Sequence, residues 1–475
     1  MCDKGPKSSK YGYLAKNTLL FAISSLGSKI LIFLLVPLYT NILSTNDYGV
    51  ADLVITTSNL LVYIFTLEIS SAVLRFAIER NSKQGEILSF GLKVVTIGSA
   101  ILTVLVLSIR NLHLFGLPDY FYVFLLLYFL GNSLNTILSS YLRAIDDVIG
   151  CVIAGISSTI IMLGGNILAL VILRWGIIGY LVSLVASQFV AVLYMAYRIW
   201  KSRTFSFMDK CERRVKKDML CYSTPLIFNG IGWWINNSLD KYFVIGMIDA
   251  AANGIFAAAL KIPTILSIFQ TIFTQAWNLS AIKEFDKDDK DGFFKTIYNT
   301  YNAGLVLLTS ILIVLNVPLA HFLFAKDFFV AWKCSSILLM SALFSALGGF
   351  IGSIFAAVKN SKIFAYSTVS AAVLNVVLNY FLILWIGIEG AAIATTASFF
   401  VMWLIRLVCA KKVINLNLSL FRDFMAYILL CMQIFMDHTD DHRYVVQVII
   451  IFILMRLYYK EIVGMVKKFV STKRN

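Results

Sequence analysis

The sequence predicts an all-α integral membrane protein with about fourteen transmembrane helices, and three observations support this fold class. Of the 475 residues, 59% are hydrophobic and 14% are charged, with a mean hydropathy of +0.81, whereas soluble chains average about 25% charged residues. The apolar residues form long unbroken runs, which favours helices because barrel strands alternate in polarity. The net charge of +15 falls in short stretches between these runs, which indicates membrane orientation and no nucleic-acid partner.

Apolar runs of about 17–25 residues, the length that crosses a bilayer, recur along the whole chain. They lie near 15–41, 49–74, 87–109, 119–142, 149–173, 177–199, 220–248, 254–281, 296–317, 328–357, 363–385, 388–409, 421–436 and 444–463. The first run is too long for a signal-peptide core and has no small-residue cleavage site, so we expect it to remain as a helix. The seven cysteines form no CxxC pair, which argues against a disulfide framework or a thiolate metal site.

The basic residues predict the orientation. If the N-terminus is cytoplasmic, the cytoplasmic tails, helix ends and loops hold 32 of the 41 Lys and Arg residues, and the outer loops hold 5. Such a bias follows the positive-inside rule. We therefore expect a multi-pass membrane protein with both termini in the cytoplasm.

A polar connection at 201–219 separates the first twelve predicted helices into two sets of six. Gly176–Gly179 (GIIG) and Gly387–Gly390 (GIEG) match at an offset of 211 residues, one in each set. Because both sets begin on the same side, they are interpreted as parallel repeats with a site between them. The expected organisation is a six-helix lobe at 1–200, a linker at 201–219, a second six-helix lobe at 220–412, and two additional helices with a cytoplasmic tail at 413–475.

Several charges lie inside apolar runs. They are Lys29 in the first run, Asp240 and Lys241 in the seventh, and Lys261 in the eighth. A charge at the centre of a spanning helix costs about 2.5–3.5 kcal/mol on insertion scales, so these side chains should face a bundle interior or a water-filled cavity. Asp240 is the leading candidate for ion coupling. The alternative is a structural ion pair between Asp240 and Lys261.

Polar residues follow helical spacing on the same runs. Asp52 begins a stripe along the second run, Glu68 and Arg75 lie on another face of it, and Asn236 precedes Asp240 by one turn. Interhelical contact is the alternative explanation, but stripes at equivalent places in both repeats favour a shared polar cavity. The candidate substrate-binding residues are Lys29, Arg75, Asn236, Lys241, Lys261, Gln275 and Asn278, and the ion-coupling candidates are Asp52, Glu68 and Asp240.

Two further constellations do not predict metal sites. The run 437–442 (DHTDDH) has suitable residue types but spans a short outer hairpin. The run 286–292 (DKDDKDG) lacks the ligands of a calcium loop at positions 5 and 12. We find no P-loop and no nucleophile with a nearby base. The sequence therefore favours a secondary transporter, which is no enzyme and needs no metal or cofactor apart from coupled H⁺ or Na⁺.

The segments Lys16–Val54, Ser71–Glu79, Leu239–Lys261 and Phe273–Lys283 resemble Wzx-type polysaccharide flippases of the multidrug/oligosaccharidyl-lipid/polysaccharide exporter superfamily. The resemblance implies a V-shaped bundle in which helices 1, 2, 7 and 8 line the cavity. It also implies alternating access that moves undecaprenyl-pyrophosphate-linked oligosaccharides, such as O-antigen or capsule units, from the cytoplasmic to the outer leaflet.

The partners implied by this resemblance are the lipid-linked oligosaccharide, the lipid bilayer, a polysaccharide polymerase and a chain-length regulator. Two alternatives stay open. The first is a MATE-type exporter of cationic drugs, against which the lysines inside the apolar runs argue. The second is a membrane glycan polymerase, which would usually need a large outer domain.

Overall fold

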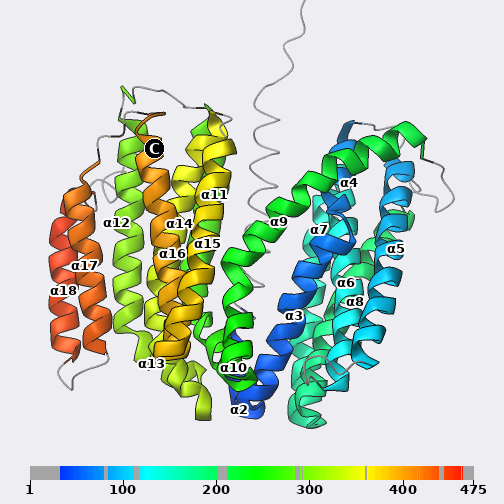
Figure 1. Ribbon diagram of the computed structural model, residues 1–475, viewed down its shortest axis with the longest axis horizontal. Helices are drawn as coiled ribbons and strands as arrows, with labels where there is room; N and C mark the ends of the chain where they lie inside the picture. Colours follow the sequence, from blue (N-terminus) through cyan, green and yellow to red (C-terminus); the bar gives the residue numbers. More distant parts are fainter. Residues whose placement is uncertain are drawn as a thin grey trace, which may run out of the picture. The chain divides into compact units, whose positions relative to one another are not determined.

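The computed structural model is an all-helical membrane protein (Figure 1). It describes residue 31 and residues 33–79, 84–111, 118–201, 211–283, 289–290, 292–358, 361–414, 416, 418–437, 443–461 and 463. Within these ranges nine helices are long and apolar enough to cross a membrane, or ten if one bent pair counts as a single span. Helix covers most of every predicted run from 49–74 onward, which confirms the fold class.

The chain divides into two compact units, Met1–Ser238 and Leu239–Asn475. The described helices of the first unit are α2 (Val36–Ile42), α3 (Thr45–Phe65), α4 (Ile69–Glu79), α5 (Gln84–Asn111), α6 (Asp119–Ala144), α7 (Val148–Asn166), the π-helix η2 (Ile167–Ile172), α8 (Gly176–Lys201) and the first part of α9 (Arg213–Met247). Buried apolar side chains of α4, α5, α6, α8 and α9 form its core.

The predicted run at 49–74 is not one continuous helix. It breaks between α3 and α4, where Leu67 and Glu68 have left-handed backbone angles (φ +52° and +49°). Each left-handed residue other than glycine costs roughly 1–2 kcal/mol. The sequence carries no Gly or Pro here to announce the break, so helical periodicity alone could not locate it.

A close backbone approach holds this break in place. A methyl group on Gly98 of α5 would lie 1.9 Å from the carbonyl oxygen of Phe65, the last residue of α3. Since backbone cannot easily yield, Gly98→Ala should lower stability by about 1–3 kcal/mol or more. Gly164→Ala in α7 is the matched control, because nothing lies within 4 Å of its added methyl group. The control should be neutral or stabilising by about 0.5–1 kcal/mol. Equal melting temperatures for the two purified variants would contradict this account.

The second unit contains the end of α9 and ten further described elements. These are α10 (Ala250–Ala259), α11 (Lys261–Lys283), α12 (Phe293–Val314), α13 (Asn316–Leu323), the 3₁₀-helix η3 (Lys326–Val330), α14 (Ala331–Ala357), α15 (Ser361–Ile386), α16 (Ile388–Ala410), α17 (Leu420–Asp437) and α18 (Arg443–Leu457). The predicted run at 254–281 is bent by 43° between α10 and α11, so the polar stripe expected along it does not follow one straight helix.

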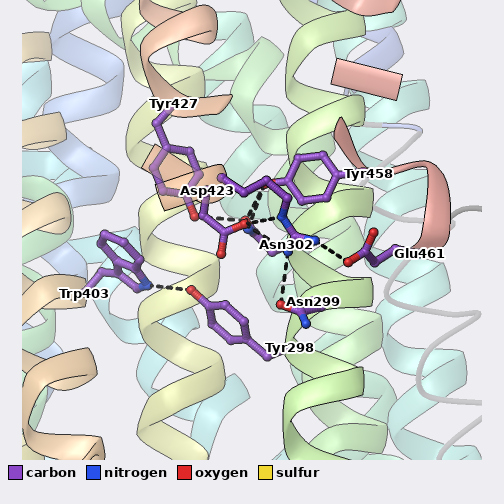
Figure 2. A network of polar contacts seen from close by, with 9 residues as sticks. Tyr298, Asn299, Asn302, Trp403, Asp423, Tyr427, Tyr458 and Glu461 are labelled. Atoms are coloured by element: carbon purple, nitrogen blue, oxygen red, sulfur yellow. Dashed lines mark hydrogen bonds and ion pairs between the residues drawn. The ribbon is translucent and has the colours of Figure 1, made fainter. Parts of the chain in front are cut away.

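The last two helices, α17 and α18, lie side by side and pack against α12 (Figure 1). A buried ionic cluster joins them at one end (Figure 2). Arg422 of α17 contacts the carboxylates of Asp423, at 3.2 Å, and of Glu461, just beyond α18. The Tyr458 hydroxyl donates a 2.9 Å hydrogen bond to Asp423, and Asn302 of α12 donates to the same hydroxyl.

Further buried hydrogen bonds join α17 and α18 to α12 and to the start of α13. Ser310 donates to Gln433 Oε1 at 2.8 Å, and Gln433 in turn donates to the carbonyl of Gln447. Near the other end Asp437 accepts from Asn316 and from Gln447. Polar pairs buried in an apolar medium are costly to leave unmatched, so this ladder specifies one register for α17 and α18 on α12.

Candidate functional site

The most deeply buried acid among the predicted site residues is Asp240, which is 3% exposed on α9. Its Oδ1 accepts a 2.5 Å hydrogen bond from the side-chain amide of Asn379, and its Oδ2 accepts one at 2.6 Å from the Thr395 hydroxyl. These partners come from α15 and α16, which pack closely together. The carboxylate thus accepts hydrogen bonds from neutral donors on two other helices.

A second amide completes the cluster. The Asn379 amide also donates to Asn375 Oδ1 at 3.0 Å, one turn earlier on α15. The side chains are almost fully buried, with Asn379 0%, Asn375 1% and Thr395 6% exposed. Among the described residues, Asn379 Oδ1 is buried without a hydrogen-bond partner. Buried polar atoms are rarely left unmatched, so this cluster has unused capacity for a ligand.

The cluster is chemically suited to a small monovalent cation or a proton. It offers oxygen atoms from one carboxylate, two side-chain amides and one hydroxyl, and hard cations prefer oxygen ligands. A half-turn of the Asn379 amide exchanges its nitrogen for its oxygen, which would present the unmatched oxygen toward a cation beside Asp240. A single carboxylate balances one positive charge.

The first unit has a buried polar contact between α7 and α2. There, Asn166 at the end of α7 donates to the Tyr39 hydroxyl at 3.0 Å. The Tyr39 ring packs against Tyr48 and Tyr180. Asp52 lies near these phenols but is only half-buried. The carboxylate of Asp240, with its amide and hydroxyl partners from neighbouring helices, belongs to the second unit.

Five predicted substrate residues lie on α9 and α11, and the side chains of three of them are described. Asn236 is buried, and its amide donates to the carbonyl of Gly232 within the same helix. Lys241 and Lys261 are half-buried, and both interact with neighbouring residues. Lys261 is the first residue of α11, at the bend after α10. Broken helices at membrane depth are typical of transporter binding sites.

The predicted residues of the second run lie in the first unit. Glu68 stands at the break between α3 and α4 and accepts a 2.9 Å hydrogen bond from Ser71. Arg75 on α4 is exposed, pairs with Glu79 at 3.1 Å, and lies 5.5 Å from the centre of the Tyr222 ring on α9. Glu68 and Arg75 belong to the first unit, and Asp240 belongs to the second.

Some of the predicted site residues lie outside the part of the chain that the structure describes. Lys29 is one of them, and the side chains of Gln275 and Asn278 on α11 are also not described. Of the run 437–442, Asp437 is described, and it bonds to neighbouring amides. No group of three or more His, Cys, Asp or Glu residues in the described ranges is arranged to hold a metal ion.

Sequence reasoning found Asp240 but missed Asn375, Asn379 and Thr395. A signal was available in the asparagines, which lie four residues apart in an otherwise apolar run and so share one helix face. Asn and Thr are common at contacts between membrane helices, however, so this spacing alone would not have separated them from ordinary packing residues.

Known proteins similar to this chain include a probable glycan biosynthesis flippase and an uncharacterized membrane protein. Residues 14–277 match the model of a family described as polysaccharide biosynthesis protein. Over 206 residues the chain is 24% identical to the probable low-salt glycan biosynthesis flippase Agl15 of Haloferax volcanii, covering 42% of this chain and 43% of that relative. The match therefore spans less than half of that relative. An uncharacterized membrane protein of Methanocaldococcus jannaschii, MJ1375, is 23% identical over 82% of this chain and 96% of its own length.

The fold is also found in solved transporter structures. The lipid II flippase MurJ in an inward closed conformation superposes with a TM-score of 0.72 and 17% identity, over 94% of this chain and 100% of that one. An inward-facing multidrug resistance MATE transporter of the MOP superfamily gives a TM-score of 0.65 and 15% identity, over 82% and 97% of the two chains. At these identities the likeness establishes the fold.

Proposed function

The chain belongs to the polysaccharide biosynthesis protein family, and from this premise we propose that it is a flippase for lipid-linked oligosaccharides. Its cargo would be an undecaprenyl-pyrophosphate-linked repeat unit, such as an O-antigen or capsule precursor, moved from the cytoplasmic to the outer leaflet. The relative in Haloferax volcanii named as a glycan biosynthesis flippase supports this class of cargo, and the MurJ-like fold supports a lipid-moving mechanism.

The observation that carries the proposed mechanism is the buried cluster around Asp240. A flippase without a nucleotide-binding motif needs another source of free energy, and a cation gradient can supply it. Binding of Na⁺ or H⁺ at Asp240 would neutralise its charge and change how α9 interacts with Asn379 on α15 and Thr395 on α16. The neutral oxygens of Asn375 and Thr395 favour Na⁺, since a proton site would not require them. Asp52 and Glu68 remain secondary candidates for coupling.

The anionic cargo requires cations. A pyrophosphate crossing bare hydrocarbon would lose its hydration at great cost, so basic side chains must replace the water. We assign this role to Lys29, Arg75, Lys241 and Lys261, with Asn236, Gln275 and Asn278 as polar contacts. Arginine and lysine both bind phosphate, and arginine does so with a bidentate geometry.

The fold likeness to a MATE transporter supports a second candidate, a cation-coupled drug exporter. The basic side chains on α9 and α11 oppose it because cationic drugs would be repelled. We also propose that the protein lies in the bacterial inner membrane with both termini cytoplasmic, and that it works beside a polysaccharide polymerase and a chain-length regulator.

The deciding experiment is removal of the protein from its own cells. A lipid-linked oligosaccharide should accumulate on the cytoplasmic leaflet, and surface glycan should fall, because the unit cannot reach the outer leaflet. Extracted lipids and leaflet-specific labelling measure both effects. Unchanged lipid-linked glycan together with hypersensitivity to cationic drugs would instead establish the MATE-type function. Accumulation of unpolymerised units on the outer leaflet would indicate a polymerase.

A further inference from the structure

The first four turns of α9 have two distinct faces within the first unit. Val215 and Met219 are 3% and 0% exposed and belong to the apolar core of that unit. Arg214, Lys217 and Cys221 follow each other at spacings of three and four and are all exposed, so they share the outer face. The helix is anchored by its apolar face and presents a basic face outward.

This basic face lines an open pocket of about 740 Å³. The described lining residues are Arg213, Arg214, Lys217, Leu220, Cys221 and Thr224. The volume lies within the range of about 300–1,000 Å³ that is usual for small-molecule sites. The lining contains three cations and no acidic side chain among the described residues. The positive end of the α9 dipole adds to this field.

The chemistry of the pocket changes along the helix axis. Arg213, Arg214 and Lys217 come first, and Leu220, Cys221 and Thr224 follow toward the apolar part of α9. Phe228, one turn further, is 77% exposed. A ligand matching this order has an anionic head followed by an apolar tail.

A fourth cation, Arg75 of α4, lies beside Tyr222 of α9, outside the described pocket lining. The Arg75 guanidinium stacks on the ring of Tyr222, 5.5 Å from its centre. The ring of Phe76 meets the same tyrosine edge to face, with 6.1 Å between the two ring centres. Arg75 also pairs with Glu79, but both side chains are more than half exposed, and exposed pairs of this kind are weak. The pair can therefore open for a stronger anionic ligand.

We propose that this pocket captures the pyrophosphate headgroup of the polyprenyl-linked substrate, with the first isoprene units against Leu220, Cys221 and Thr224. The inference rests on the proposed flippase function and deepens it, because it assigns a first docking place for the cargo. A polyprenyl pyrophosphate carries more negative charge than a phospholipid with a single phosphodiester, so it matches three cations better. A soluble nucleotide lacks the tail that the apolar end of the pocket would hold.

The test uses the purified full-length protein in nanodiscs and undecaprenyl pyrophosphate as the probe. The double variant Arg214→Gln/Lys217→Gln should weaken binding by about tenfold or more, since each removed charge-assisted contact is worth roughly a factor of ten. Lys216→Gln is the matched control, because Lys216 stacks on Phe90 of α5, 5.8 Å from its ring centre, outside the pocket lining. The control should leave the affinity unchanged, and melting temperatures verify folding.

Two further arms distinguish the ligand sources. Thr224→Trp should weaken binding of undecaprenyl pyrophosphate and leave binding of inorganic pyrophosphate unchanged, because it fills the apolar end without altering charge. Phosphatidylglycerol should compete poorly. Equal affinity for phosphatidylglycerol, or an equal loss in Lys216→Gln, would overturn the proposal in favour of general attraction to acidic lipids.

A reconstituted flipping assay separates this inference from the proposed function. If the wild type and the double variant bind the probe and flip lipid-linked oligosaccharide equally well, the docking pocket is wrong and the flippase function stands. If the wild type neither binds the probe nor flips the oligosaccharide, the proposed function itself fails. If the wild type binds and flips normally while the double variant binds more weakly and flips more slowly, the result supports both the docking pocket and the flippase function.

Discussion

Replacing Asp240 by Asn should abolish stabilisation of the purified protein by Na⁺ and uncouple transport from the cation gradient. A ligand that binds only the folded state at 100 times its Kd stabilises it by about 2.7 kcal/mol, and the variant should lose this gain. Even loss of a group that supports a metal ligand costs roughly 10–100-fold in affinity, so loss of the carboxylate itself should cost at least as much. Asn preserves the shape of the side chain, which keeps the effect on folding small.

Thr395→Val tests the same site and should have a smaller effect than Asp240→Asn. It removes the hydroxyl that lies 2.6 Å from Asp240 Oδ2 while keeping the branched shape, and it should weaken the Na⁺ effect without eliminating it. Melting curves in NaCl and KCl measure both variants. A wild type that ignores Na⁺ but transports in response to a pH gradient would identify H⁺ as the coupling ion. Full gradient-dependent transport by Asp240→Asn would remove this site from the mechanism.

The fold class was predictable because hydrophobicity is a strong one-dimensional signal. Long apolar runs require helices in a bilayer, and Asp240 was found because a carboxylate inside such a run is unusual. Its partners were not found, because Asn379 and Thr395 lie 139 and 155 residues away in the chain. Only the packing of α15 and α16 brings them to the carboxylate.

The breaks within spans escaped prediction for a different reason. The turn at Leu67 and Glu68 uses left-handed backbone without glycine, and it depends on the close approach of Gly98 to Phe65. Tertiary contacts therefore decide where that helix ends. The same holds for Arg422, which in the sequence is one more basic residue at a helix end and in the fold is a partly buried cation shared by two carboxylates.

Replacing Arg422 by Met should be among the most destabilising single changes in the second unit. Its side chain is 18% exposed, and those of its partners Asp423 and Glu461 are 0% and 14% exposed. One oxygen of each carboxylate is already buried without a hydrogen-bond partner. Removing the cation leaves both acids buried and uncompensated. Breaking a buried ion pair in this way costs about 3–5 kcal/mol, so the melting temperature and the membrane protein level should both fall.

Glu461→Gln should cost much less than Arg422→Met, although it removes a partner of the same cluster. The cluster has two carboxylates for one guanidinium, so this variant leaves Arg422 balanced by Asp423, which also keeps the Tyr458 hydroxyl at 2.9 Å. Adding Glu461→Gln to Arg422→Met should recover part of the loss, because one of the two uncompensated charges is then gone. A double-mutant cycle on melting temperature measures this coupling. Equal losses for the two single variants, with additive behaviour in the double variant, would show that shape rather than charge holds α17 and α18 to α12.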